Sequence, residues 1–130
     1  MRSIKFRAWK DGIKYNVRTL AWHHENIVNI LIYDGTLEGK WLCSWDALEQ
    51  FTGLYDENGK EIYEGDVIEA YDTKLRVTFQ GVVKFGDASF YIESTTGTKH
   101  FRWIDYVAII VIGNIHENPD ENPELVEALA

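Results

Sequence analysis

The sequence predicts an all-β protein, and three observations lead to that prediction. Aromatic residues make up 14% of the 130 residues, and they favour strands over long helices. Short apolar stretches recur at intervals of about ten residues, as in sandwiches and small barrels. The residues between them are mostly Gly, Asp, Asn and Thr, which are typical of turns. With 45% apolar residues, the chain can build a packed core.

Four strands are expected in the first third of the chain. Residues 4–9 alternate in polarity, and Asp11-Gly12 then predicts a tight hairpin turn into a second strand at 14–18. Residues 27–33 are rich in β-branched side chains and predict a third strand, and residues 41–43 a short fourth one.

The next segment is interpreted in two steps. Ser44 can cap a helical turn, so residues 44–49 predict a short turn or helix. Asn58-Gly59 then predicts a two-residue hairpin turn, with positive φ at both positions, inside a hairpin at 51–63. Glu64-Gly65-Asp66 ends that hairpin before a new strand begins.

The second half continues the β pattern. The predicted strands are 67–71, 76–79, 81–85, 89–93, 99–103 and 107–112. Residues 108–112 are nearly all apolar, which predicts a strand that is buried on both faces or seals a barrel. In the tail, Asn122 as cap and Pro123 as first helical residue predict a short helix over 124–129.

Three stretches of this sequence resemble one known family. They are residues 4–9, residues 50–66 and residues 111–119, in which His116 replaces the more usual tyrosine. In this order they are similar to the YopX family, small proteins encoded by bacteriophages and prophages. The repeated Glu-Asn-Pro of residues 117–124 departs from the single copy of the family pattern. The family brings no established enzymatic activity, so the resemblance implies no catalytic residue. For residues 44–49 the resemblance favours an extended approach to Phe51 instead of a short turn or helix.

The resemblance, together with the Gly65-Asp66 turn, also implies an SH3-like barrel in the second half. We therefore expect two small β subdomains and a tail. The expected boundaries are 1–62 for an N-terminal β subdomain that includes the hairpin 51–63, 63–116 for the SH3-like barrel, and 117–130 for an acidic tail with a short helix.

Charge is divided unevenly along a chain of net charge −8. Residues 1–45 hold seven basic and four acidic residues, a balance of +3, and the remainder therefore carries −11. An acidic protein disfavours non-specific binding to nucleic acids, which depends on neutralising phosphates. One cysteine and no secretory leader predict a soluble cytoplasmic protein, and the family resemblance implies the cytoplasm of a bacterial host.

Candidate sites for chemistry are few, and we expect neither a metal nor a cofactor. His23, His24 and Glu25 form the cluster most like a metal site, but zinc needs three or four converging ligands, and a solvated turn is the favoured interpretation. Cys43 lies between Leu42 and Ser44, where we expect a small buried thiol rather than a nucleophile.

The basic N-terminal region is the candidate interaction surface. It combines cations with aromatic rings, as platforms for single-stranded nucleic acid do. The residues are Lys5, Arg7, Trp9, Lys14, Tyr15 and Arg18. The alternative is that this surface meets the acidic segment 46–66, within the chain or in a neighbouring subunit, and we favour that alternative.

These observations predict a non-enzymatic phage or prophage accessory protein. We expect it to act through protein–protein contacts, as a homo-oligomer and with a host or phage protein as a further possible partner. A nucleic-acid-binding module that uses the N-terminal hairpin or the small barrel is the alternative function.

Overall fold

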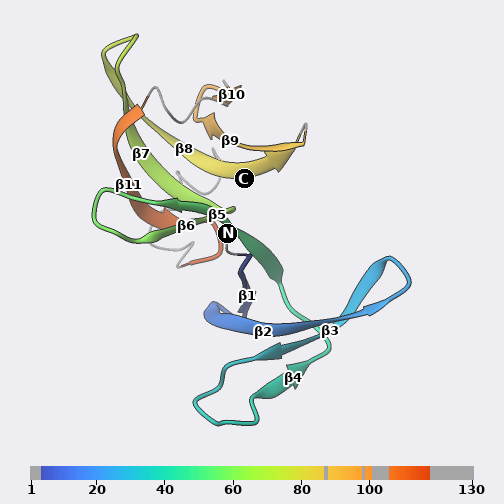
Figure 1. Ribbon diagram of the computed structural model, residues 1–130. Coiled ribbons are helices and arrows are strands. Elements are labelled where there is room, and N and C mark those ends of the chain that lie inside the picture. The colour runs from blue at the N-terminus through green and yellow to red at the C-terminus, as the bar shows by residue number, and fades with distance from the viewer. Residues whose placement is uncertain (1–3, 87, 98, 101–105, 118–130) are drawn as a thin grey trace. The chain divides into compact units, whose positions relative to one another are not determined.

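The computed structural model describes residues 4–86, 88–97, 99–100 and 106–117 (Figure 1). Its strands form two antiparallel sheets, and the described residues contain no helix. The all-β prediction is therefore confirmed. Within the described part of the chain there is accordingly no helix that is long and apolar enough to cross a membrane. The chain divides into two compact units between Gln50 and Phe51.

The first unit is a sheet in the order β4-β3-β2-β1-β5, in which all neighbours are antiparallel. Its strands are β1 (Phe6–Lys10), β2 (Ile13–His23), β3 (Asn26–Ile32), β4 (Lys40–Leu42) and the first part of β5 (Ala47–Tyr55). The turn from β1 to β2 has positive φ at both Asp11 (54°) and Gly12 (77°), so the predicted two-residue hairpin turn is confirmed.

One face of this sheet carries the first core. Ala8, Ile30, Ile32 and Leu42 are buried there, with half-buried apolar side chains around them. Because side chains alternate along a strand, Leu31 and Tyr33 project from the opposite face, which we call the outer face. Trp41 precedes the buried Leu42 and lies on the outer face as well.

The second unit begins within β5, which continues past Gln50 and pairs with β6 (Glu61–Tyr63). The remaining strands form a sheet in the order β10-β9-β8-β7-β11. They are β7 (Asp66–Asp72), β8 (Val77–Gly86), β9 (Ser89–Ser94), β10 (Lys99–His100) and β11 (Tyr106–Asn114).

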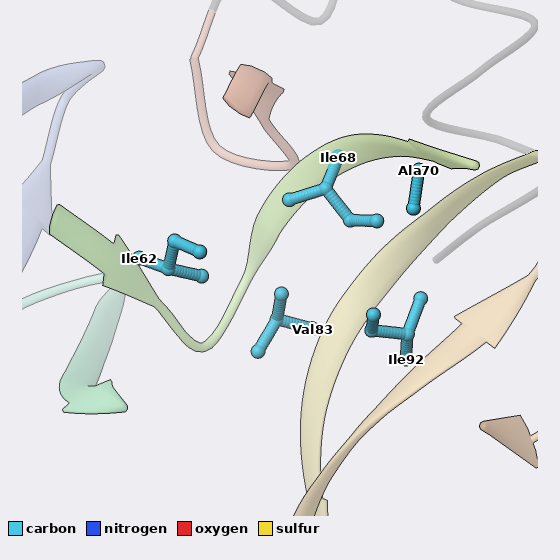
Figure 2. Packing of buried hydrophobic residues seen from close by; sticks show 5 residues of the cluster. All are labelled: Ile62, Ile68, Ala70, Val83 and Ile92. Atoms are coloured by element: carbon cyan, nitrogen blue, oxygen red, sulfur yellow. The ribbon is translucent and has the colours of Figure 1, made fainter. Parts of the chain in front are cut away.

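The second core joins the β5–β6 hairpin to this sheet. Figure 2 shows its buried side chains, Ile62 from β6, Ile68 and Ala70 from β7, Val83 from β8 and Ile92 from β9. Strand β8 lies close to β9 at Gly81, where an added Cβ would lie 2.6 Å from Ile92 Cγ2 and 2.8 Å from the carbonyl oxygen of Glu93. Only glycine fits at this position without displacing the neighbouring strand.

The core also explains where the unit boundary falls. We expected the hairpin 51–63 to belong to the first subdomain, with a boundary after residue 62. The structure places the hairpin in the second unit, because Ile62 packs against Ile68, Val83 and Ile92.

Several local predictions are corrected. Ala47 to Glu49 form a strand rather than a helical turn, because they pair with β1. The strands predicted at 76–79 and 81–85 are one strand, β8, which begins at Val77 and runs through Gly81. Residues 108–112 are not buried on both faces, because Ile109 and Val111 pack against the second core while Ala108 and Ile112 are exposed.

Other predictions keep their status. The described pairings leave the second sheet open, with β10 at one end and β11 at the other, so the SH3-like barrel stays a prediction. The helix expected over 124–129 lies outside the described residues, as does most of the acidic tail 117–130.

Candidate interaction surface

Residues 50–66 carry the clearest turn signals of the sequence, and the polar side chains of this segment have structural roles. The turn between β5 and β6 is built around Asp56, whose Oδ1 accepts hydrogen bonds from the backbone N–H groups of Asn58 (2.9 Å) and Lys60 (2.8 Å). Of the Asn58-Gly59 pair, only Gly59 has positive φ, at 81°. The predicted two-residue turn is therefore wrong. A longer loop forms, because the Asp56 carboxylate accepts hydrogen bonds from the backbone N–H groups of residues later in the turn.

Asp56 also fastens this turn to β11. Its Oδ2 accepts a hydrogen bond from Val111 N (3.0 Å), and Glu57 N donates to Ile109 O (2.9 Å). Burial raises the pKa of Asp56, but the hydrogen bonds from backbone N–H groups outweigh burial and the Lys60 charge adds to them, so the pKa lies below the ordinary 3.8. These two residues give β11 the donor and acceptor that a neighbouring strand would supply.

Asp66 has a comparable role at the start of β7. It is almost completely buried, and its carboxylate accepts hydrogen bonds from Tyr63 N (2.9 Å) and Asn114 Nδ2 (3.1 Å). Asn114 Oδ1 in turn accepts a hydrogen bond from His116 N (2.8 Å). The Glu64-Gly65-Asp66 turn and the end of β11, far apart in the sequence, are thus held together.

Two of the six residues expected on the basic surface are inside the protein. Arg7 and Trp9 are each 4% exposed, and both donate to the same oxygen of Glu49, with Arg7 Nε at 2.8 Å and Trp9 Nε1 at 2.7 Å. The expectation that they form part of an exposed platform is corrected. β1 pairs with β5, which brings the acidic residue directly beside them. This contact is the one expected from the favoured alternative, a basic strand that meets segment 46–66.

The other four predicted residues are divided between the surface and the first core. Lys5, Lys14 and Arg18 are exposed. Tyr15 is half-buried and packs against the first core, because it alternates with Lys14 along β2. Of the predicted surface, therefore, three cations remain accessible in the described structure.

Around Arg18 the structure gathers side chains that were not predicted as a site. The guanidinium carbon of Arg18 lies 5.2 Å from the ring centroid of Tyr33, and Nη1 donates to Leu37 O at 2.7 Å. The tight return of the loop 33–39 requires glycine at Gly39, where φ is 72° and an added Cβ would lie 2.6 Å from Ile32 O. The loop therefore holds Arg18 against Tyr33.

Trp41 completes this surface on the neighbouring strand. Thr19, Leu31 and Trp41 lie side by side in one row across β2, β3 and β4. Tyr33 is 56% exposed, Trp41 54% and Leu37 96%. We call this part of the outer face the aromatic surface, made of Arg18, Leu31, Tyr33, Leu37 and Trp41. The sequence held a signal for this surface, because side chains alternate between two faces in residues 30–33 and 41–42. Once one side chain of such a strand is known to be buried, the alternation assigns the others to the core or to the outer face.

The three stretches that resemble the YopX family thus occupy β1, the β5–β6–β7 region and the end of β11. A model of this family, described as YopX protein, matches residues 5–127. The chain belongs to the YopX family.

This chain is similar to the crystal structure of protein EF1440 from Enterococcus faecalis, with 26% sequence identity and a TM-score of 0.61. The similarity covers 97% of this chain and 99% of EF1440. No curated protein matches the chain.

The remaining candidate residues of this YopX protein lie at turns. His23 and His24 stand at the tip of the β2–β3 hairpin with ring centroids 4.4 Å apart, and His24 has a φ of 55°. Within the described ranges, no group of three or more His, Cys, Asp or Glu side chains is arranged to hold a metal ion. Cys43 is exposed, which corrects the expectation of a buried thiol, because it follows β4 and leaves the sheet.

Proposed function

We propose that this YopX family protein is a phage or prophage accessory protein that acts without catalysis, by binding other protein subunits. The observation that carries the proposal is the aromatic surface. Trp, Tyr and Arg dominate the energetic centres of protein–protein interfaces. Here all three occur together on one exposed sheet face, beside Leu31 and the nearly fully exposed Leu37.

The buried carboxylates support a non-enzymatic role. An acid–base pair needs carboxyl groups that can reach a substrate and exchange protons with it. Asp56 and Asp66 are instead buried and accept hydrogen bonds from backbone and amide N–H groups, while Glu49 accepts those of Arg7 and Trp9. These groups are committed to holding the fold.

Self-association is the form of binding that we propose first. An isologous contact between two copies needs only one suitable surface, and cyclic dimers are the commonest protein oligomers. Sedimentation velocity of the full chain at several concentrations tests this. We expect a species of at least twice the monomer mass, and a monomer at every concentration would contradict the proposal.

A second candidate function is binding of single-stranded nucleic acid, which the stacking of Arg18 on Tyr33 and the exposed Lys14 favour. Fluorescence anisotropy with labelled single-stranded DNA at low salt tests it, because screening is weakest there. Binding that disappears in Arg18→Glu, and persists in Lys84→Glu of the second unit, would support this candidate.

The proposal extends to three properties of the family resemblance. We propose that the protein acts in the cytoplasm of the bacterial host, that a host or phage protein is a further partner, and that the second unit is an SH3-like barrel. Recovering the tagged protein from lysogenic cells, and identifying what is bound to it, tests the first two.

A further inference from the structure

The aromatic surface spans three neighbouring strands, and each strand contributes a different kind of side chain. Arg18 projects from β2, Leu31 and Tyr33 belong to the middle row on β3 and its end, and Trp41 projects from β4. The strand order β4-β3-β2 therefore places a cation on one flank of an apolar row and an indole on the other. The row of Thr19, Leu31 and Trp41 places Thr19 level with Trp41, and Arg18 precedes Thr19 at a register shift, so its backbone lies within about one residue of that height.

This arrangement is complementary to itself. Two copies that face each other can be related by a two-fold axis that lies between them and runs parallel to β3. This axis places β2 of the second copy over β4 of the first, and β4 of the second copy over β2 of the first. Arg18 of each copy then lies opposite Trp41 of the other at nearly the same height. A guanidinium over an indole ring is a favourable cation–π pair, and the middle rows meet as an apolar centre.

We propose that the aromatic surface binds a second copy of this chain face to face, with Arg18 of each copy against Trp41 of the other. This inference rests on the proposed function and names its partner and its surface.

Charge on and around the surface supports a protein partner of this kind. Lys14 and Arg18 are exposed on β2, and Asp34 and Glu38 are exposed in the loop that follows β3. With Lys40, which is exposed beside Trp41 and interacts with Asp34, three cations and two carboxylates leave this region with a charge of +1, whereas the whole chain carries −8. Two such surfaces meet with little net repulsion, while a polyphosphate would find an excess of only one cation there.

The arrangement within one chain also favours the contact. The loop 33–39 holds Arg18 in place through the hydrogen bond to Leu37 O and the stacking on Tyr33. A side chain that is ordered before association loses little conformational entropy on binding. The guanidinium is therefore positioned in advance for the indole of the second copy.

The test compares Trp41→Ala, Arg18→Ala, the double variant and Trp22→Ala by sedimentation equilibrium. Trp22 is the matched control, because it is 61% exposed but lies opposite Ile27, a residue of the first core, and so projects from the other face. We expect the dissociation constant of the dimer to rise by about 30-fold in Trp41→Ala and by about five-fold in Arg18→Ala. Trp22→Ala should leave it unchanged.

The double variant tests the pairing itself. Residues that contact each other give non-additive effects. The double variant should therefore weaken the dimer by less than the product of the two single effects. Circular dichroism of each variant confirms that the sheets are intact, which we expect for substitutions at exposed positions.

The possible failures are distinguishable. If the protein self-associates and Trp41→Ala has no effect, the proposed function stands and this surface is wrong. Strictly additive effects of the two single variants would contradict the Arg18–Trp41 pairing. If the protein is monomeric, both proposals fall. A monomer whose binding to single-stranded DNA requires Trp41 would replace them with the nucleic-acid function.

Discussion

The two units of this YopX protein use their buried carboxylates for different purposes. In the first unit, the described residues include one buried carboxylate, Glu49, and it accepts hydrogen bonds from two side chains, Arg7 and Trp9. In the second unit, Asp56 and Asp72 accept backbone N–H groups at the ends of hairpins, and so define where strands begin and end.

The surfaces of the units differ as well. The three exposed aromatic side chains of the first unit, Trp22, Tyr33 and Trp41, include two tryptophans, and two of the three belong to the outer face. The second unit covers one edge of its sheet with its own hairpin, through Asp56 and Glu57. The second unit exposes Tyr55 and Phe85 as well, so the units differ in the edge that the hairpin covers rather than in whether they expose aromatic side chains.

The largest expected effect tests whether the buried hydrogen bonds of Asp66 stabilise the second unit. Asp66→Ala leaves Tyr63 N and Asn114 Nδ2 buried without their acceptor. The free energy of unfolding should fall by about 4 kcal/mol, because each buried donor without a partner costs about 1–3 kcal/mol. Urea denaturation measures the change.

The control for Asp66 is Asp46→Ala. Asp46 is exposed and accepts a hydrogen bond from Asp11 N at 2.8 Å, so its loss should cost about 0.5 kcal/mol. Equal effects of the two substitutions would show that the stability of the second unit does not depend on the buried hydrogen bonds of Asp66.

The next effect concerns the first unit. Glu49→Gln removes the carboxylate that is paired with Arg7 Nε and should lower the free energy of unfolding by about 3 kcal/mol, since breaking a buried ion pair is strongly destabilising. The Lys84–Glu93 pair is the control, because both side chains are partly exposed and Glu93→Gln should cost about 0.5 kcal/mol or less. A cost for Glu49→Gln as small as that of the control would mean that Arg7 is balanced by other groups.

A smaller effect concerns the contact between the β5–β6 turn and β11. In Asp56→Asn, one carboxylate oxygen becomes an NH₂ group, so either Val111 N or the turn loses its acceptor. We expect a loss of about 2 kcal/mol and faster hydrogen exchange at the Val111 amide. Asp72→Asn alters the β7–β8 turn instead and should leave the Val111 amide protected. Unchanged exchange at Val111 in Asp56→Asn would contradict the role of this contact.

The smallest effect is the dependence of stability on pH. The pKa of Asp56 is lowered in the folded protein, so the unfolded chain takes up this proton more readily. The resulting stabilisation is complete above the unfolded pKa of 3.8 and is lost as the pH falls through the lower folded value. Stability measured between about pH 5 and pH 2 should therefore fall less steeply in Asp56→Asn than in the wild-type protein. Parallel curves would show that this carboxylate titrates alike in both states.

Much of the fold could be predicted from the sequence. Alternation in residues 4–9, β-branched side chains in 27–33 and the Asp11-Gly12 turn predicted strands and a hairpin that the structure confirms. These signals succeed because the period of two and the positive φ of a tight turn are local properties of the chain. The uneven distribution of acidic residues along the chain was visible in the sequence too. The sequence did not show which of these residues would be buried.

What the sequence alone determined is the all-β class, the family and most of the strands, since each follows from short patterns of residues. The tertiary structure decided the fate of individual side chains. Pairing of β1 with β5 placed Arg7 and Trp9 in the interior beside Glu49. Pairing of β3 with β4 set Trp41 in line with Leu31 on an exposed face. A strand pattern says which side chains share a face, but only the neighbouring strands determine whether that face is covered.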